Sequence, residues 1–267
     1  MTSEKQTYGL GFSEPIIGVI LGANGGIAQA MIDLIIETHP QNRLILTTRS
    51  HLESSTDHSS SQISFHPLDI TDEEQWFNFA QFLSDQTTTI NLVINVTGLL
   101  HKRALPQVKE HKFTEIKPEK SLKMVQLEQM SAVFSVNTFA VALALKFLSP
   151  FLSRSTRSIF ASLSARVGSI SDNQLGGWYS YRASKAAQNM LIKTASIELS
   201  RSRKKNICVG LHPGTVATKL SEPFSSRVTH QIFTPQESAS YLLQVLSKLN
   251  PSDTGKCFAW DGQEILP

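Results

Sequence analysis

The amino-acid sequence predicts an α/β fold, a doubly wound and mostly parallel seven-stranded sheet with helices on both faces. Three observations predict it. Short apolar runs alternate with longer amphipathic segments along the chain. Several of these runs are apolar nearly throughout, which is typical of strands buried in a parallel sheet. Parallel neighbours also need crossover helices, and the amphipathic segments between the runs can supply them.

The expected strands and helices follow one another in a regular order. The clearest helix is expected over Gly26–Thr38, where apolar residues recur from Ile27 at intervals of three and four and share one face. Thr71-Asp-Glu-Glu74 and Thr234-Pro-Gln-Glu237 have the pattern of a capping box and predict two helix starts. The strands are expected at Ile16–Leu21, Arg43–Thr48, Ile63–His66, Ile90–Val96, Ser158–Leu163, Ile207–Leu211 and Cys257–Trp260.

Length and composition favour one domain over residues 1–267, with residues 1–15 as an N-terminal extension. A chain of 267 residues, of which 40% are hydrophobic, can bury a full core, and no linker or internal repeat divides it. The formal net charge of +3 is too small to indicate a nucleic-acid partner. No apolar run approaches the roughly 20 residues that span a bilayer, so we expect no membrane partner.

The cysteines and histidines argue against other kinds of site. Cys208 and Cys257 each lie in a short apolar run, and we expect two buried thiols rather than a disulfide. The eight histidines show no spacing typical of a metal site, so we expect no metal. The polar N-terminal residues lack the pattern of a signal peptide, and we expect a cytoplasmic location.

The first expected strand runs directly into a glycine-rich turn, Gly22-Ala-Asn-Gly-Gly26, which leads into the helix over Gly26–Thr38. Glycines at this junction let the backbone turn tightly and approach a pyrophosphate, which the positive end of the helix attracts. A turn that uses glycine only for its φ angle is the alternative. The position of the glycines favours a dinucleotide site in a Rossmann-type fold.

The second chemical motif is Tyr181-Arg-Ala-Ser-Lys185, which lies downstream of an expected strand that ends in serines. Residues four apart share one face of a helix, so the phenol and the ammonium point the same way. A free tyrosine has a pKa of about 10, and a nearby lysine cation is expected to lower that pKa. A surface pair on a helix is the alternative. Beside a dinucleotide site, the pair predicts that Tyr181 acts as a general acid or base.

With these motifs in place, nearly the whole chain resembles the short-chain dehydrogenase/reductase family. Ser164-Ala-Arg-Val-Gly-Ser-Ile and the ending Phe258-Ala-Trp-Asp-Gly262 resemble its C-factor or sniffer-like branch most. The motifs that carry the resemblance are the glycine motif (Gly22 and Gly26, with Ala28 in place of its last glycine), Asn95-Val-Thr-Gly98, Tyr181 with Lys185, and His212-Pro-Gly-Thr-Val-Ala-Thr218.

The resemblance implies an NAD(P)-dependent oxidoreductase that moves a hydride between the cofactor and a carbonyl or alcohol substrate. Tyr181 would exchange the proton, and Lys185 would lower its pKa and bind the cofactor ribose. Asn137 would support a water chain to Lys185, Asp69 would lie beside the adenine ring, and Thr218 would lie near the nicotinamide. The implied cofactor-binding residues are Gly22, Asn24, Gly26, Ile27, Arg49, Asp69, Ile70, Asn95, Gly98, Tyr181, Lys185, Pro213, Gly214, Val216 and Thr218.

The serine that would donate a hydrogen bond to the substrate oxygen is ambiguous. Aligned on Gly168, the family's catalytic position is Ala165, and Ser164 stands one residue before it. Either the loop shifts by one residue and Ser164 serves, or the usual serine is absent. Ser162 would point the same way as Ser164 in an extended strand. We expect Ser164 to be catalytic, against the alternative that it only satisfies the backbone at a strand end.

The cofactor is expected to be NADP in preference to NAD. NAD-preferring sites place an acid at the end of the second strand, whereas an arginine there accommodates the 2′-phosphate of NADP. Here the strand ends in Thr48-Arg49-Ser50, and the next carboxylate is Glu53. The alternative is that Arg49 stacks on the adenine or faces solvent.

The basic segment 101–123, the oligomeric state and the overall function each allow more than one expectation. We expect the basic segment 101–123 to be a solvated connection, with an anionic substrate or a membrane surface as alternative ligands. The resemblance implies a homodimer or homotetramer that pairs through the helices with Asn137 and Tyr181. An enzyme acting on a small carbonyl or alcohol is the expected function. A dinucleotide-binding sensor or signalling protein with little or no turnover is the alternative.

Overall fold

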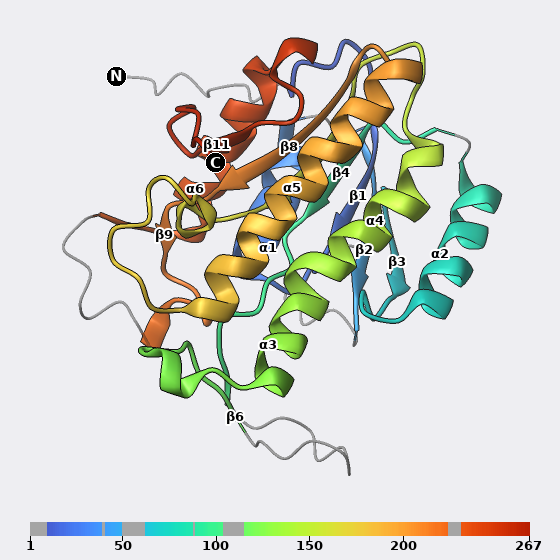
Figure 1. The fold of residues 1–267 in the computed structure, drawn as a ribbon. Helices are drawn as coiled ribbons and strands as arrows, with labels where there is room; N and C mark the ends of the chain where they lie inside the picture. The colour runs from blue at the N-terminus through green and yellow to red at the C-terminus, as the bar shows by residue number, and fades with distance from the viewer. Residues whose placement is uncertain (1–9, 39–40, 50–61, 88, 104–114, 224–230) are drawn as a thin grey trace.

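The structure, a computed structural model, describes residues 10–38, 41–49, 62–87, 89–103, 115–223 and 231–267. Its central sheet has seven parallel strands in the order β11-β8-β7-β4-β1-β2-β3 (Figure 1). This order confirms the predicted fold class. The strands are β1 (Ile17–Leu21), β2 (Arg43–Thr48), β3 (Ile63–Pro67), β4 (Leu92–Asn95), β7 (Ser158–Leu163), β8 (Asn206–His212) and β11 (Cys257–Ala259).

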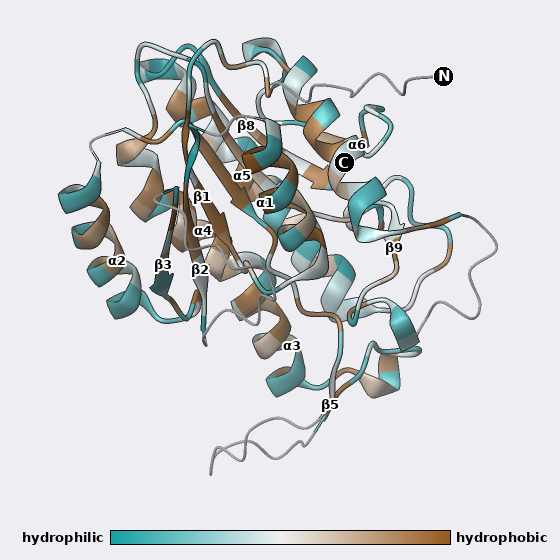
Figure 2. Ribbon diagram, turned by 180° about the vertical axis from the view of Figure 1, so that it is seen from behind, coloured by the Kyte–Doolittle hydropathy of each residue, from teal (hydrophilic) through white to brown (hydrophobic). Residues whose placement is uncertain are grey.

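Helices cover both faces of the sheet. One face carries α1 (Gly26–Thr38) and α6 (Pro235–Lys248), and the other carries α2 (Glu73–Gln86), α4 (Ala140–Leu148) and α5 (Tyr179–Ser202). Figure 1 shows α4 and α5 side by side in front of the sheet. In Figure 2, seen from behind, the strands of the sheet interior are hydrophobic and lie between these two layers.

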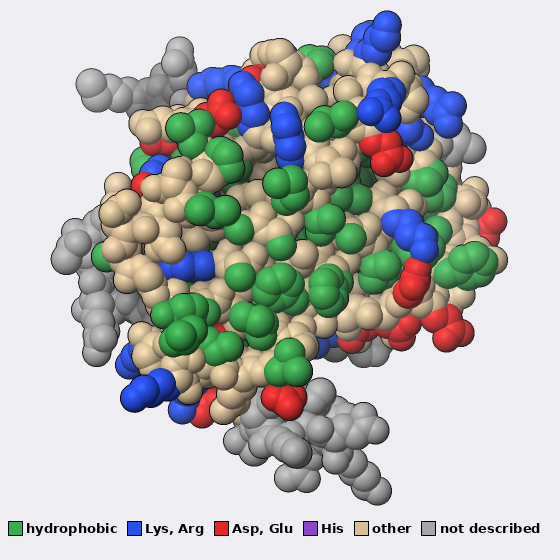
Figure 3. All heavy atoms as spheres, viewed as in Figure 1, with side chains coloured by type: hydrophobic (Ala, Val, Ile, Leu, Met, Phe, Trp, Pro, Cys, Tyr) green, Lys and Arg blue, Asp and Glu red, His purple; other side chains and the backbone are tan. Residues whose placement is uncertain are grey.

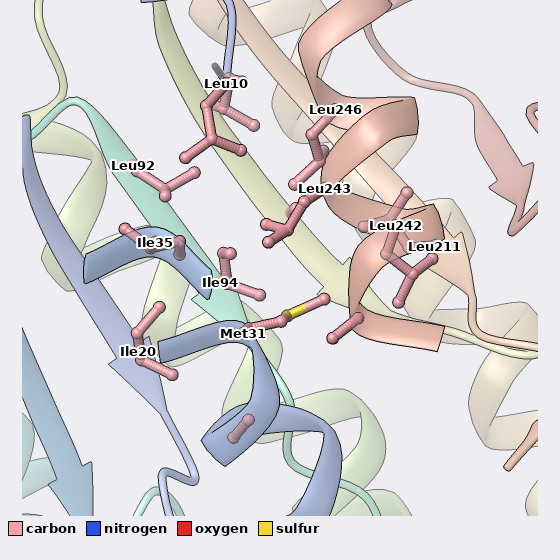
Figure 4. Close-up of a cluster of buried hydrophobic side chains, with 14 of the residues drawn as sticks. Leu10, Ile20, Met31, Ile35, Leu92, Ile94, Leu211, Leu242, Leu243 and Leu246 are labelled. Carbon is pink, nitrogen blue, oxygen red and sulfur yellow. The ribbon is translucent and has the colours of Figure 1, made fainter. Parts of the chain in front are cut away.

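The core is divided into two parts by the sheet, because successive side chains of a strand point to opposite faces. In β1, Ile20 packs with α1 and α6, whereas Val19 and Leu21 pack with α2 and α4. Figure 4 shows the first part, where Met31 of α1 and Leu243 of α6 meet the sheet. Full burial of a side chain of this kind stabilises the fold by about 1.5–3 kcal/mol.

Two short pairs of strands lie outside the central sheet. β5 (Lys102–Arg103) pairs with β6 (Glu115–Ile116), and β9 (Thr215–Val216) pairs with β10 (Ile232–Phe233). The sequence did not predict either pair, since runs of two residues show no periodicity. The second pair belongs to the site described below.

The helix starts test the two predicted capping boxes. Thr234 caps α6 as predicted, with both bonds of the box to Glu237 present. Thr71 does not cap α2, and this prediction is wrong. Asp72 is the N-cap, and its carboxylate accepts from the N–H groups of Glu74 and Gln75. A carboxylate is as good an N-cap acceptor as a threonine hydroxyl, so the helix begins one residue later than predicted.

The expectation that no segment is long and apolar enough for a bilayer is also wrong. Leu127–Phe151 is a continuous helical run of 25 residues that passes the length and composition criteria for a membrane span, with 44% of its most apolar window buried in the structure. It consists of α3 (Leu127–Phe134), a π-helical turn over Ser135–Phe139, α4 and a short 3-10 turn. Here α4 packs between α2 and α5, so this run is a helix of the core.

Candidate active site

The predicted motifs meet at the carboxyl edge of the sheet, where the strand order reverses. β1 and β4 are neighbours there, and their last residues, Leu21 and Asn95, are register partners. β7 ends beside β4, and its last residues pair with β8. Ligands of doubly wound sheets bind in the crevice at this switch point. The edge therefore brings together motifs that lie far apart in the sequence.

Gly22 makes the turn from β1 toward α1 in a conformation suited to glycine. Its φ is +83°, and a Cβ at this position would lie 2.7 Å from Cγ2 of Thr97. The N–H groups of Gly22 and Ala23 both donate to the carbonyl of Thr47 at 3.0 Å. The turn is thus tied to β2 and pressed against the loop after β4.

The start of α1 fits the pyrophosphate of a dinucleotide. Gly25 and Gly26 are exposed, and no acidic side chain stands in the first turn of this 13-residue helix. Ile27 points inward and is buried. A Cβ on Gly26 would lie 3.6 Å from Cγ2 of Thr218. An open backbone at the positive end of a helix attracts phosphate, and the segment with Thr218 lies directly opposite.

The end of β2 lies beside this turn. Asn24 donates from Nδ2 to the hydroxyl of Thr48 at 3.2 Å. The next residue along the chain, Arg49, is exposed. The structure therefore places Arg49 at the rim of the glycine turn, with its side chain free of the core.

Asp69 and Ile70 follow β3 at the same edge. The carboxylate of Asp69 accepts from the N–H of Thr71 at 2.9 Å and from its hydroxyl at 2.7 Å. Ile70 is buried, and its carbonyl accepts from the indole of Trp76 at 2.9 Å. These bonds fix the loop in which the resemblance places the adenine contacts.

Asn137 lies in the π-helical turn and joins three segments. Its Oδ1 accepts from the N–H of Leu99 at 2.7 Å, and its Nδ2 donates to the carbonyl of Leu99 at 2.9 Å. Nδ2 also reaches the hydroxyl of Ser184 on α5 at 3.0 Å. A Cβ on Gly98 would lie 3.9 Å from Asn137 Oδ1. π-Helical turns are common at functional sites, and this one locks the loop after β4 to the helix of Tyr181.

The segment after β8 forms the opposite wall. Gly214 has a φ of +77°, and a Cβ there would lie 2.7 Å from the ring of Phe233. Val216 pairs with Phe233 in the short sheet of β9 and β10. The carbonyl of Pro213 is fixed by a hydroxyl of α6 at 2.9 Å, and the N–H of Thr218 donates to a serine hydroxyl at 3.2 Å. The predicted nicotinamide segment is thus held in place on both sides.

Tyr181 and Lys185 lie one turn apart on α5. Lys185 is 2% exposed, and its Nζ is 5.8 Å from the centre of the Tyr181 ring. The ammonium donates to the carbonyl of Leu163 and to Oε1 of Gln188, both at 2.8 Å. Among the described residues, no hydrogen bond joins Lys185 to the phenol.

Burial shifts the pKa values of both groups. It raises the pKa of Tyr181 to about 12 and lowers the pKa of Lys185 to about 7. The expectation that Lys185 lowers the pKa of Tyr181 is therefore wrong for this structure. Desolvation of the phenolate dominates, because the lysine is itself poorly charged and hydrogen-bonded elsewhere. At neutral pH the phenol holds its proton, and the raised pKa makes it a weaker acid than a free tyrosine.

The Ser164 hydroxyl, the predicted donor to the substrate oxygen, has partners within the protein. The hydroxyl of Ser164 is buried and donates to Oδ1 of Asn189 at 2.7 Å, and it also contacts the thiol of Cys257. No contact among the described residues joins Ser164 to Tyr181. Ala165, at the family's catalytic position, is buried. Ser164 thus has a side-chain partner on α5, and its role as oxyanion donor stays a prediction.

Ser162, the other candidate, lies deeper. It is fully buried and accepts from Nδ2 of Asn95 and Nε2 of Gln188, each at 3.0 Å. Gln188 also binds Lys185 and the carbonyl of Leu163. Gln188 is not among the predicted site residues, although its position three residues after Lys185, on the same face of a helix, is a usable signal.

The basic segment 101–123 is only partly a solvated connection. Residues 104–114 lie outside the described residues. In the remainder, Lys117, Lys120 and Lys123 are exposed, but Ile116 and Glu119 are buried. A buried glutamate among lysines leaves no periodic signal, so the burial of Glu119 was not predictable from the sequence. Both predicted free thiols are found buried.

Comparison with known proteins agrees with this geometry. Residues 17–229 match the family described as short chain dehydrogenase. The chain belongs to this family. The predicted resemblance is confirmed, and with it NAD(P)-dependent oxidoreduction as the general activity.

Two curated relatives extend this result. The chain is 26% identical over 245 residues to 1-hydroxy-2-glutathionyl-2-methyl-3-butene dehydrogenase of Rhodococcus sp. (strain AD45), covering 91% of this chain and 96% of the relative. It is 30% identical over 141 residues to the C-signal of Myxococcus xanthus, covering 53% of this chain and 80% of the relative. The second relative agrees with the predicted C-factor branch.

Two solved structures have the same fold. An NADPH-bound carbonyl reductase from chicken fatty liver superposes with a TM-score of 0.77 at 23% identity, covering 98% of this chain and 97% of the other. The carbonyl reductase Sniffer of D. melanogaster superposes with a TM-score of 0.78 at 22% identity, covering 95% of this chain and all of the other.

Proposed function

We propose that this short-chain dehydrogenase reduces a small carbonyl compound with NADPH and that Tyr181 donates the proton. The pair of Tyr181, which is half-buried, and Lys185, which is buried, carries the proposal. Tyr181, with a pKa of about 12, keeps its proton at neutral pH, and Lys185 lies one turn further on. A protonated phenol can donate to a carbonyl oxygen on which negative charge develops.

The other residues hold the reacting groups in place. The cofactor, when bound, would supply the hydride. The exposed start of α1 would hold its pyrophosphate, and the segment with Thr218 would hold its nicotinamide end. Lys185 uses two of its three N–H donors on Leu163 and Gln188, which leaves the third for the cofactor ribose or the phenol. Asn137 keeps the loop after β4 against α5.

We propose NADPH rather than NADH as the cofactor. Arg49 is exposed at the end of β2, at the rim of the glycine turn, and the sequence has no carboxylate after the strand until Glu53. An arginine there suits a 2′-phosphate. The carbonyl reductase from chicken fatty liver, which has the same fold, is described with NADPH bound, and this supports the same preference.

The first experiment is a fluorescence titration of the protein with NADPH and NADH, followed by a panel of aldehydes, ketones and diketones. We expect tighter binding of NADPH, and its oxidation when a carbonyl is added. Tyr181→Phe should lower kcat by about 10²–10⁴-fold, because it removes the proton donor, while the Kd for NADPH changes little. Arg49→Ala should weaken NADPH and leave NADH unchanged. Turnover that survives in Tyr181→Phe would show that another group is the acid.

A binding protein with little turnover is the second candidate. Two observations favour it: the similarity to the C-signal of Myxococcus xanthus, and the bond of the Ser164 hydroxyl to Asn189 instead of a position at Tyr181. The same titration separates the two functions. Tight NADPH binding without oxidation by any member of the panel would support the second.

We further propose that a second copy of this chain covers α4 and α5. Figure 3 shows apolar side chains gathered over these helices on one face of the molecule. Phe139, Met190 and Ile197 are exposed there, beside a hollow of about 430 Å³ that Ala142 and Leu191 help to line. Light scattering should give twice the chain mass of 29.5 kDa, and Met190→Glu should give the single mass.

A further inference from the structure

A carboxylate lies buried beside the first turn of α5. Glu119 is 1% exposed, and it is the one Asp or Glu of the described residues that is buried. No ion pair found among the described residues includes it. Burying a carboxylate is unfavourable unless hydrogen-bond donors replace its lost water. The donors around Glu119 therefore show what it holds.

Two of those donors come from Ser180, the residue before Tyr181. Oε2 of Glu119 accepts the N–H of Ser180 at 3.2 Å, and Oε1 accepts its hydroxyl. N–H groups in the first turn have no acceptor within their helix, and the positive end of the helix favours a carboxylate. Glu119 thus acts from another segment of the chain as the cap of the helix that carries Tyr181.

The backbone of Glu119 holds the residue at the helix entrance. Its carbonyl accepts the N–H of Trp178 at 2.5 Å. Trp178 has φ 51° and ψ 45°, a left-handed conformation that a tryptophan rarely adopts, and Gly176 and Gly177 before it are also left-handed. The indole lies edge-on to Tyr181, with 6.2 Å between ring centres. One residue therefore fixes both the strained turn and the start of α5.

Glu119 is itself held from α3. Gln129 donates from Nε2 to Oε1 of Glu119 at 3.3 Å and to the carbonyl of Lys117 at 2.8 Å, and its Oε1 accepts the N–H of Lys117 at 3.1 Å. Gln129 lies on the same helical run as Asn137, which binds Ser184. Ser180 and Ser184 share one face of α5 and bracket Tyr181 in sequence, so the run fixes the tyrosine's helical turn at both ends.

We infer that Glu119 is a positioning residue that sets the place of the Tyr181 hydroxyl and of the Trp178 ring. This inference rests on the proposed function, in which Tyr181 donates the proton. Glu119 touches neither the phenol nor the glycine turn in the described contacts, so it acts on the rate of proton transfer and not on cofactor binding. A misplacement of about 1 Å can lower a rate by about 10²-fold.

The test uses Glu119→Ala and Glu119→Gln in the full chain. We expect Glu119→Ala to lower kcat by about 10²-fold, with the Kd for NADPH within twofold of the parent. Glu119→Gln keeps one oxygen for the Ser180 N–H but loses the second acceptor, so its kcat should lie between the two. Glu115→Gln is the matched control, because Glu115 is a more exposed carboxylate of the same segment, paired with Lys117.

A second control separates positioning from stability. Leu83→Ala removes a buried side chain of α2, away from the site, and should lower Tm without lowering kcat at a temperature where the protein is folded. The inference is overturned if Glu119→Ala loses no more kcat than Leu83→Ala, or if it raises the Kd for NADPH while kcat is unchanged.

A hydrogen-exchange measurement, which needs no turnover, tests the inference separately from the proposed function. Hydrogen exchange of the peptide around residues 178–184 should be faster in Glu119→Ala than in the parent, while exchange around Gly22–Gly26 is unchanged. If no carbonyl of the panel leads the parent protein to oxidise NADPH, the proposed function fails. The hydrogen-exchange measurement still decides whether Glu119 holds the turn. Unchanged exchange at 178–184 would overturn the inference.

Discussion

Two junctions between a strand and a helix build the candidate site, and they are held by different means. The junction from β1 to α1 is short, and glycine geometry fixes it. Gly22 makes the turn at φ +83°, and two N–H groups anchor it to the neighbouring strand. Its turn depends on the backbone freedom of glycine, and its anchor on β2, the carbonyl of Thr47, belongs to another segment.

The junction from β7 to α5 is long, and distant segments hold it. Ser164 binds Asn189, Trp178 and Ser180 bind Glu119, and Ser171 binds the carbonyl of Pro267 at the end of the chain. None of these partners is a near neighbour in sequence. The comparison teaches that backbone geometry at one glycine shapes the cofactor end of the site, whereas several side chains from other segments hold the catalytic end.

Gly22→Val would break the first junction, which depends on glycine geometry. Valine strongly resists a φ of +83°, and its Cβ would lie 2.7 Å from the side chain of Thr97. We expect the Kd for NADPH to rise by about 100-fold, which corresponds to about 2.8 kcal/mol. Titration of NADPH fluorescence measures it.

Gly262→Val is the control for this change. Gly262 also has a φ of +83°, but it lies near the C-terminus with no atom closer than 4.0 Å to an added Cβ. This variant should lose about 1–2 kcal/mol of stability from the left-handed backbone and keep its affinity for NADPH. Equal loss of affinity in both variants would show that Gly22 acts through stability alone.

The fold was predictable because its signals are periodic and local. The helix over Gly26–Thr38 is found with the predicted bounds. Strand ends were less predictable: Ile90 belongs to the expected strand by its apolar character, but in the structure it makes only an isolated bridge to Leu152. Apolar character does not show where the pairing partner ends.

The candidate site was predictable in part. Spacing and family resemblance identify Gly22, Asn137, Tyr181 and Lys185 in the sequence. The structure places the segments that carry them at one edge of the sheet. Glu119 has no such signal, since its role depends on a contact across 61 residues of sequence. The pKa of Tyr181 also resisted prediction. Spacing shows that a lysine is near, but burial, which dominates here, is a property of the packed structure.

Lys185 gives a pH-dependent test of the second junction. Its pKa falls from 10.5 to about 7 on folding, so between these values the unfolded chain binds more protons than the folded one. Stability should therefore rise with pH across this window, and the full penalty of the buried charge applies below pH 7. Lys185→Met removes that penalty.

We expect Lys185→Met to be more stable than the parent at pH 6.5, on the order of a few kcal/mol, with a gain that shrinks steadily toward pH 9.5. Urea unfolding at four pH values measures it. A gain that does not vary with pH would mean that Lys185 is already paired or hydrated in the folded protein.

Ser164→Ala should have the smallest effect and sharpens the comparison most. If the hydroxyl serves only Asn189, the variant should lose about 1 kcal/mol of stability and keep kcat within about tenfold. A donor to the substrate oxygen would instead be worth about 10²–10³-fold in kcat. Ala165→Ser is the reciprocal change, because it places a hydroxyl at the family's catalytic position. If Ser164 is structural, Ala165→Ser should raise kcat for carbonyl reduction. The new hydroxyl could donate to the substrate oxygen, whereas the Ser164 hydroxyl donates to Asn189.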